Sequence, residues 1–128
     1  MKARSEKTGR VVVIDCGLGN LSSIKNALVR IGVQPIISRN SDEILSADAI
    51  IFPGVGAFAS AMKKILALGL AETIKTAAVE RKIPFLGICL GMQVLFEGSE
   101  EFGWHTGLGI LSGNVAAFDP TKFDPKLQ

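Results

Sequence analysis

A cysteine between glycines is the residue in this sequence best suited to chemistry. Cys89 is the centre of residues 87–91, Gly-Ile-Cys-Leu-Gly, where an apolar strand pattern meets a helix pattern. This is the layout of a nucleophile elbow, whose sharp turn needs glycines because neighbouring Cβ atoms would collide. The start of a helix favours a thiolate, and the N–H of Leu90 can point at a developing oxyanion. The pattern predicts a nucleophilic Cys89, and the alternative is a buried structural cysteine.

Two further glycine turns follow predicted strands. Residues 53–56, Pro-Gly-Val-Gly, are expected beside the elbow, at the sheet edge where open α/β folds bind ligands. Their N–H groups could complete an oxyanion hole, although Pro-Gly is also ordinary turn chemistry. Residues 17–22 form only a partial dinucleotide fingerprint, with Ser22 in place of the third glycine, although Arg39 could meet a 2′-phosphate. The expected role of this turn is to cap a helix or to shape a surface for a partner.

The other cysteine and the histidine are expected to have structural roles. Cys16 ends the first predicted strand, and it lies far from Cys89 in the chain. Two cysteines and one histidine give no ligand spacing for a metal, and we expect neither a metal nor a cofactor. His105 lies in a glycine-rich segment, where a histidine is usually solvated or hydrogen-bonded locally.

The segments that must position these turns alternate between strand and helix patterns. Buried strands are predicted by β-branched or apolar runs at residues 10–15, 35–38, 49–52 and 84–88. Helices are predicted by apolar spacings of three and four at residues 21–31, from residue 41, twice within 58–78, and at 90–97. The alternation predicts an α/β fold with an open, mostly parallel sheet and helices on both faces, as in flavodoxin. A further strand is expected at residues 114–118, and a loop or hairpin at 119–128.

Composition and charge exclude several classes of protein. The chain has 128 residues, of which 48% are hydrophobic and 20% are charged, so one packed domain is expected rather than disorder. Residues 1–9 predict a flexible basic leader before a domain at 10–128, and the leader explains the net charge of +2. A nucleic-acid surface is therefore not expected. No apolar run suits a membrane span or a secretory signal, and two cysteines make no disulfide framework, so we expect a cytoplasmic protein.

The three turns together resemble the class I (triad) glutamine amidotransferases. Residues 87–93, Gly-Ile-Cys-Leu-Gly-Met-Gln, are similar to the family's nucleophile segment, and residues 53–58, Pro-Gly-Val-Gly-Ala-Phe, to its oxyanion strand. Residues 15–21 and the Ser-Glu-Glu of 99–101 narrow the resemblance to the glutaminase subunits of imidazole glycerol phosphate synthase. The resemblance covers about residues 10–118.

The resemblance implies a glutaminase that works through a thioester. Cys89 would attack the carboxamide of glutamine, release ammonia and form a γ-glutamyl thioester, which water then hydrolyses. Gly54, Val55 and Gly56 correspond to the family's oxyanion turn, and Leu90 supplies the other N–H.

The resemblance also implies a substrate site and a partner. Gln93 and Glu101 match positions that hold glutamine, and a carboxylate at Glu101 suits the ammonium group of this substrate. The loop around Asn20 is similar to one at a subunit interface. The implied partner is a (β/α)8-barrel cyclase subunit of the HisF type in a heterodimer. It would use the ammonia to make imidazole glycerol phosphate in histidine biosynthesis.

The sequence departs from the family in the general base, and other interpretations remain open. The family takes its base from a His-x-Glu pair beyond a His-Met-Gly-Trp-Asn segment, and neither occurs in these 128 residues. We therefore expect a domain truncated at its C-terminus, inactive by itself. A related amidotransferase could instead feed a partner that amidates surface sugars. The DJ-1/PfpI group has a similar cysteine elbow, but there His typically follows the cysteine, where this chain has Leu90. A flavodoxin-like binding module with an inert Cys89 is the non-enzyme alternative.

Overall fold

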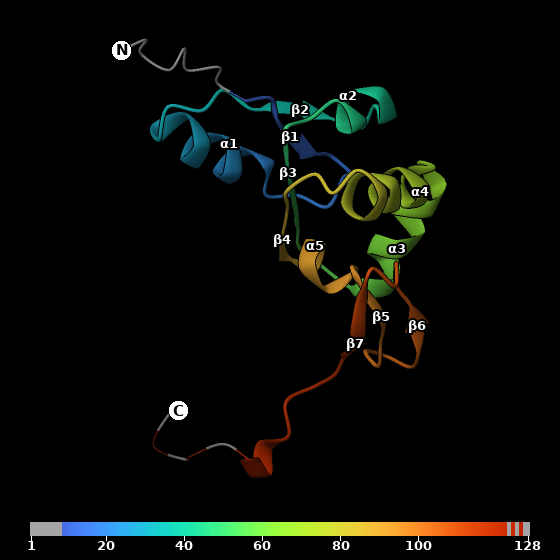
Figure 1. The fold of residues 1–128 in the computed structure, drawn as a ribbon. Helices are drawn as coiled ribbons and strands as arrows, with labels where there is room; N and C mark the ends of the chain where they lie inside the picture. The colour runs from blue at the N-terminus through green and yellow to red at the C-terminus, as the bar shows by residue number, and fades with distance from the viewer. Residues whose placement is uncertain (1–8, 123, 125, 127–128) are drawn as a thin grey trace.

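A four-stranded parallel sheet forms the centre of the molecule (Figure 1). The computed structural model describes residues 9–122, 124 and 126, so most of the predicted leader lies outside the described residues. The strand order is β2-β1-β3-β4, with β1 at Val11–Ile14, β2 at Ile36–Ser38, β3 at Ala49–Gly54 and β4 at Phe85–Cys89. Each strand lies within two residues of its predicted bounds, so the predicted parallel sheet is confirmed.

Pairing between β3 and β4 brings the two glycine turns of interest together. β3 runs two residues beyond its predicted end, through Pro53 and Gly54. In the parallel register Pro53 lies opposite Ile88, and Gly54 lies opposite Cys89. The carboxyl end of β3 therefore lies directly beside the cysteine.

Helices cover both faces of this sheet, as predicted. In order along the chain they are α1 (Leu21–Arg30), α2 (Ser41–Leu45), α3 (Phe58–Ala67), α4 (Leu70–Lys75) and the π-helical turn η1 (Thr76–Glu80). α1 lies on one side of the sheet, and α2, α3 and α4 lie on the other (Figure 1). None of the described helices is long and apolar enough to cross a membrane.

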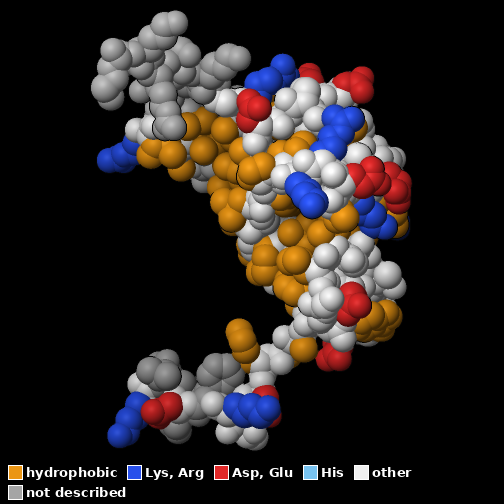
Figure 2. Space-filling view, viewed as in Figure 1, with side chains coloured by type: hydrophobic (Ala, Val, Ile, Leu, Met, Phe, Trp, Pro, Cys, Tyr) orange, Lys and Arg blue, Asp and Glu red, His pale blue; other side chains and the backbone are white. Residues whose placement is uncertain are grey.

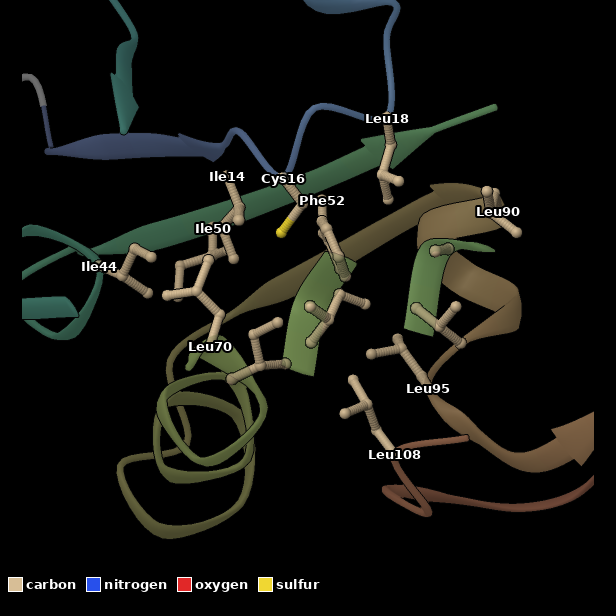
Figure 3. Close-up of a cluster of buried hydrophobic side chains, with 14 of the residues drawn as sticks. Ile14, Cys16, Leu18, Ile44, Ile50, Phe52, Leu70, Leu90, Leu95 and Leu108 are labelled. Carbon is tan, nitrogen blue, oxygen red and sulfur yellow. The ribbon is translucent and has the colours of Figure 1, made fainter. Parts of the chain in front are cut away.

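The hydrophobic core lies between the sheet and α2, α3 and α4 (Figure 3). Ile14, Ile50 and Phe52 from the strands meet Ile44 and Leu70 from the helices, and all five side chains are almost completely buried. Burial of each such side chain contributes about 1.5–3 kcal/mol. This core fixes the position of β3 and therefore of the glycine turn that follows it.

The face of the sheet that α1 covers is less completely packed. α1 contributes no buried residue. A hollow of about 350 Å³ remains on this face, lined by Val11, Leu28, Ala49, Ile50, Ile51, Pro84, Phe85 and Leu86. Figure 2 shows hydrophobic side chains gathered over the hollowed side of the molecule. α1 therefore covers only part of this face.

The helix predicted at residues 90–97 is wrong beyond its first turn. α5 spans only Leu90–Gln93, and β5 follows at Phe96–Ser99. In β5 a Cβ on Gly98 would overlap the ring of Trp104, so glycine lets that ring approach the strand closely. Glycine also disfavours a helix interior by about 1 kcal/mol relative to alanine. Tertiary packing on Gly98 therefore replaces the expected helix with a strand.

β5 is the centre of a small second sheet that the sequence pattern did not predict. It pairs antiparallel with β6 (His105–Thr106) and parallel with β7 (Leu111–Val115). β7 begins three residues before the strand predicted at 114–118, and its Gly113, with a φ of 107°, lies where the register between β5 and β7 shifts. The 3-10 turn η2 (Pro120–Lys122) lies in the segment predicted as a loop.

Candidate active site

Cys89 occupies the sharp turn between β4 and α5. Its φ of 55° and ψ of −118° are rare for a residue with a side chain, and such a conformation costs about 1–3 kcal/mol. The glycines on either side are required by contacts. A Cβ on Gly87 would lie 2.7 Å from the Cα of Met92, and one on Gly91 would overlap the carbonyl oxygen of Phe52. This turn has the geometry of a nucleophile elbow, and its cysteine is exposed.

The predicted oxyanion turn lies next to the cysteine but has one N–H engaged elsewhere. Gly54 is the register partner of Cys89. Gly56 has a φ of 113°, and the Val55 side chain is exposed. The N–H of Val55 donates to the carbonyl of Leu18 at 2.9 Å, a contact that sequence reasoning missed. This N–H can serve an oxyanion only after that bond is broken.

The predicted N–H donor of Leu90 lies on the other side of the cysteine. Leu90 is the first residue of α5, and its side chain is buried. The first N–H groups of a helix have no partner within the helix. This N–H therefore follows the cysteine directly, as an oxyanion donor of an elbow does.

Gln93 and Glu101, the predicted substrate residues, line one pocket of about 330 Å³. Its other lining residues are Ser99, Glu100, Val115, Ala116 and Ala117. Gln93 lies at the end of α5, the single turn that Cys89 precedes. The buried Ser99 hydroxyl accepts the N–H of Glu101 at 3.1 Å and fixes the backbone there. A turn of this kind could have been predicted from Ser99, because serine side chains commonly bond to the backbone N–H two residues further on.

The loop between β1 and α1 lies against the oxyanion turn. A Cβ on Gly19 would lie 3.2 Å from the Val55 side chain. Asn20, the predicted interface residue, has a φ of 67° at the start of α1, and its exposed side chain makes no capping bond. Arg39 forms a 3.0 Å ion pair with Asp15 rather than standing free for a 2′-phosphate.

Replacing Asp15 by Asn is expected to remove a pH dependence of stability. The N–H of Gly17 at 2.9 Å, and then Arg39, hold the pKa of the Asp15 carboxyl below its usual range. This stabilisation is present above the unfolded-state pKa of about 4 and is lost as the pH falls through the lower folded-state value. Urea unfolding near neutral pH and at about pH 3 should show a larger loss in the wild type than in Asp15→Asn. Equal losses in both proteins would contradict this.

The other cysteine and the histidine have structural surroundings, as expected. Cys16 is 3% exposed within the core cluster, and burial, followed by the charge of Asp15, raises the pKa of its thiol to about 11. The Nε2 of His105 lies 3.3 Å from the carbonyl oxygen of Phe102, a local contact within the β5–β6 connection. Within the part of the chain that the structure describes, no three His, Cys, Asp or Glu residues could hold a metal ion together.

Fold and site together define an α/β domain in which an exposed cysteine, in a turn with the geometry of a nucleophile elbow, lies at the carboxyl edge of a parallel sheet. Comparison with known families makes this specific. Residues 12–116 match the family described as "Glutamine amidotransferase class-I". The chain belongs to the class-I glutamine amidotransferase family, which confirms the resemblance.

Individual relatives agree with this assignment. The chain is 48% identical over 118 residues to "Imidazole glycerol phosphate synthase subunit HisH" of Sulfurimonas denitrificans. The matched segment covers 92% of this chain and 56% of the relative. The protein of the same name from Bacillus licheniformis is 53% identical over 103 residues, covering 80% and 48%. "Imidazole glycerol phosphate synthase hisHF, chloroplastic" of Arabidopsis thaliana is 45% identical over 119 residues, covering 93% and 20%. The chain spans about half the length of the HisH relatives.

A solved structure supports the fold. The chain described as "Crystal structure of glutamine amidotransferase" matches with a TM-score of 0.68 at 24% identity, covering 82% of this chain and 55% of that one. The predicted fold class is therefore confirmed.

Proposed function

We propose that the chain carries the nucleophile and the substrate pocket of a glutaminase subunit of imidazole glycerol phosphate synthase. The observation that carries the proposal is the strained conformation of Cys89 with Gly54 as its register partner. The relatives named HisH, with identities between 41% and 53%, support the choice of subunit.

The chemistry begins with binding of glutamine in the pocket of Gln93 and Glu101. The carboxylate of Glu101 attracts the ammonium group of glutamine, since charge-assisted bonds are the stronger ones. A general base takes the proton of the Cys89 thiol, and the sulfur attacks the γ-carboxamide carbon. The N–H of Leu90 and, once its bond to Leu18 is broken, the N–H of Val55 stabilise the oxyanion. The C–N bond then breaks, the nitrogen takes a proton and leaves as ammonia, and a thioester remains. Water hydrolyses the thioester, which yields glutamate and the free thiol.

Proton transfer to the leaving nitrogen requires a general acid–base residue. We propose that a His-x-Glu pair of the family type supplies it, because His105 is bonded locally to Phe102. The same pair would first take the proton of the Cys89 thiol and then give it to the leaving nitrogen.

The ammonia would be used by a (β/α)8-barrel cyclase of the HisF type. The name hisHF of the Arabidopsis relative, of which the matched segment is 20%, supports such a pairing. Asn20 lies on the exposed loop beside the oxyanion turn, where contact with a partner could influence the site. We propose a cytoplasmic location, since both cysteines are free thiols.

A chimeric protein tests this function. The matched 118-residue segment of the Sulfurimonas HisH is replaced by the corresponding segment of this chain, and the chimera is expressed in a bacterium that lacks its own glutaminase subunit. We expect growth without histidine in minimal medium, where glutamine is the nitrogen donor. The same chimera with Cys89→Ala should not grow, because the nucleophile is absent.

The outcomes separate the alternatives. Failure of a folded chimera that still hydrolyses glutamine would favour a different ammonia acceptor, such as a sugar-modifying partner. A folded chimera without any glutamine hydrolysis would contradict the enzyme proposal and favour a binding module.

A further inference from the structure

We propose that Lys64 is a positioning residue of the site: it holds the loop of residues 17–19 against the glycine turn of residues 54–56. The inference rests on the proposed function, which gives that glycine turn its role toward an oxyanion. Lys64 lies in α3, on an element that contributes no predicted catalytic side chain.

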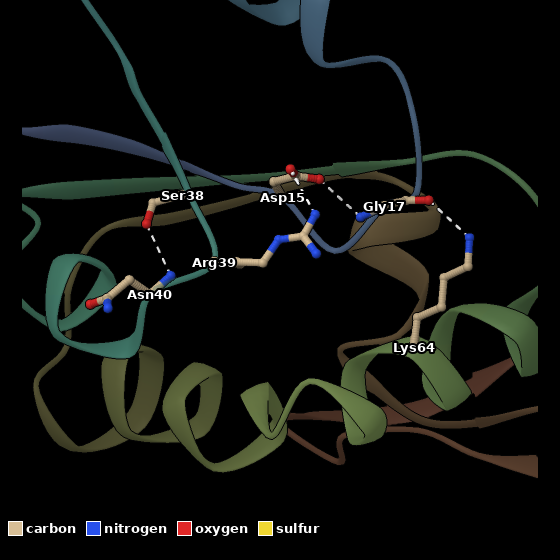
Figure 4. Close-up of polar contacts among 6 residues, drawn as sticks. All are labelled: Asp15, Gly17, Ser38, Arg39, Asn40 and Lys64. Carbon is tan, nitrogen blue, oxygen red and sulfur yellow. Dashed lines mark hydrogen bonds and ion pairs between the residues drawn. The ribbon is translucent and has the colours of Figure 1, made fainter.

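The first step is a contact between α3 and the loop. The Nζ of Lys64 donates to the carbonyl oxygen of Gly17 at 2.9 Å, and the N–H of Gly17 donates to Asp15 at 2.9 Å (Figure 4). Asp15 is held in turn by the ion pair with Arg39. Both backbone polar groups of Gly17 are therefore bound by charged side chains. With its φ of 70°, Gly17 is otherwise free to adopt other conformations.

The second step leads from Gly17 to the oxyanion turn. Leu18 follows Gly17 directly, and its carbonyl accepts the N–H of Val55 at 2.9 Å. The Leu18 side chain is buried against Gly54, where an added Cβ would lie 3.0 Å from the Leu18 Cδ1. A shift of the Gly17 carbonyl therefore moves the group that holds the Val55 N–H. By restraining the Gly17 carbonyl, Lys64 therefore helps to keep the Val55 N–H bound to Leu18.

The composition of α3 explains why Lys64 turns toward the loop. The helix contains no Asp or Glu, so no acidic residue of α3 competes for the ammonium group. The neighbouring Lys63 has the same charge and is also exposed, but the bond to Gly17 belongs to Lys64. Lys63 therefore provides a matched control.

Amide hydrogen exchange in the 128-residue chain, measured by NMR, tests the proposal. In Lys64→Met the Val55 amide should exchange about fivefold faster, because an exposed charge-assisted bond that restrains the loop is lost. Lys64→Arg should restore slow exchange, and Lys63→Met should leave it unchanged. Amides of the buried strand β1 should exchange at the wild-type rate in all three variants.

Three results would overturn the proposal. They are unchanged exchange at Val55 in Lys64→Met, an equal increase in Lys63→Met, or a uniform increase across β1, which would show a purely structural role. Since exchange needs no glutamine chemistry, failure of the chimera to grow would contradict the proposed function and leave the exchange result standing.

Discussion

A glutamine analogue that carries a chloromethyl ketone in place of its carboxamide is expected to alkylate Cys89 and to leave Cys16 unmodified in the folded chain. Cys89 is exposed in the strained turn, whereas Cys16 is buried with a thiol pKa raised to about 11. The thiolate is the reactive form of a cysteine. Burial therefore protects Cys16 in two ways, because it keeps the reagent away from the sulfur and it disfavours the thiolate. Chloride leaves without a proton, so alkylation tests the nucleophile and the pocket without requiring a general acid.

Peptide mapping by mass spectrometry locates the label, and three variants test which residues determine it. Cys89→Ser should abolish labelling of the folded chain, and Cys16→Ser should be labelled like the wild type. Glu101→Gln should slow the analogue about tenfold at low concentration, because the carboxylate that attracts its ammonium group is lost. Iodoacetamide, which has no ammonium group, should modify Glu101→Gln and wild type at the same rate.

Other results would change the assignment. Equal labelling of both cysteines would contradict the elbow as the reactive site. An equal slowing of iodoacetamide in Glu101→Gln would indicate damage to the pocket rather than loss of substrate recognition.

The parallel sheet could be predicted because its signal is local. The β-branched run of β1 buries Val12, Val13 and Ile14 completely, which requires cover on both faces. The sequence pattern predicts a helix for the whole segment after Cys89, because Leu90, Val94 and Leu95 fit a helical period, but the second half of this segment is the strand β5. This strand depends on Trp104 and β7, partners that no short sequence window contains.

In the candidate site, too, the local features could be predicted from the sequence and the long-range contacts could not. Gly87 and Gly91 make the turn at Cys89 predictable from the sequence. Each is required by a close contact, Gly87 with Met92 a few residues along the chain and Gly91 with Phe52 of the adjacent strand. The bond from Val55 to Leu18 and the bond from Lys64 to Gly17 join residues far apart in sequence, and no motif predicts them. These bonds decide whether a predicted oxyanion donor is free. The sequence therefore predicts which groups could react, and the fold shows which of their N–H groups are already bound.

Gly91→Ala is expected to destabilise the protein by about 3 kcal/mol or more. The added methyl group would overlap the carbonyl oxygen of Phe52 in β3, and it would lie 2.7 Å from the carbonyl carbon. Either β3 or α5 must move, and both are rigid backbone around a buried position. Urea unfolding followed by circular dichroism measures the loss.

Helix propensity makes this a stringent test of the elbow. Gly91 lies in α5, where alanine would be favoured over glycine by about 1 kcal/mol if only the helix mattered. Gly109→Ala is the control: that glycine has a φ of 65° and no atom within 4 Å of an added Cβ, so only backbone strain of about 1 kcal/mol is expected. Equal losses in the two variants would show that contact with β3 does not set the geometry at Cys89. A larger loss in Gly91→Ala, together with slower labelling of Cys89 by the glutamine analogue, would show that close packing of α5 on β3 holds the nucleophile in place.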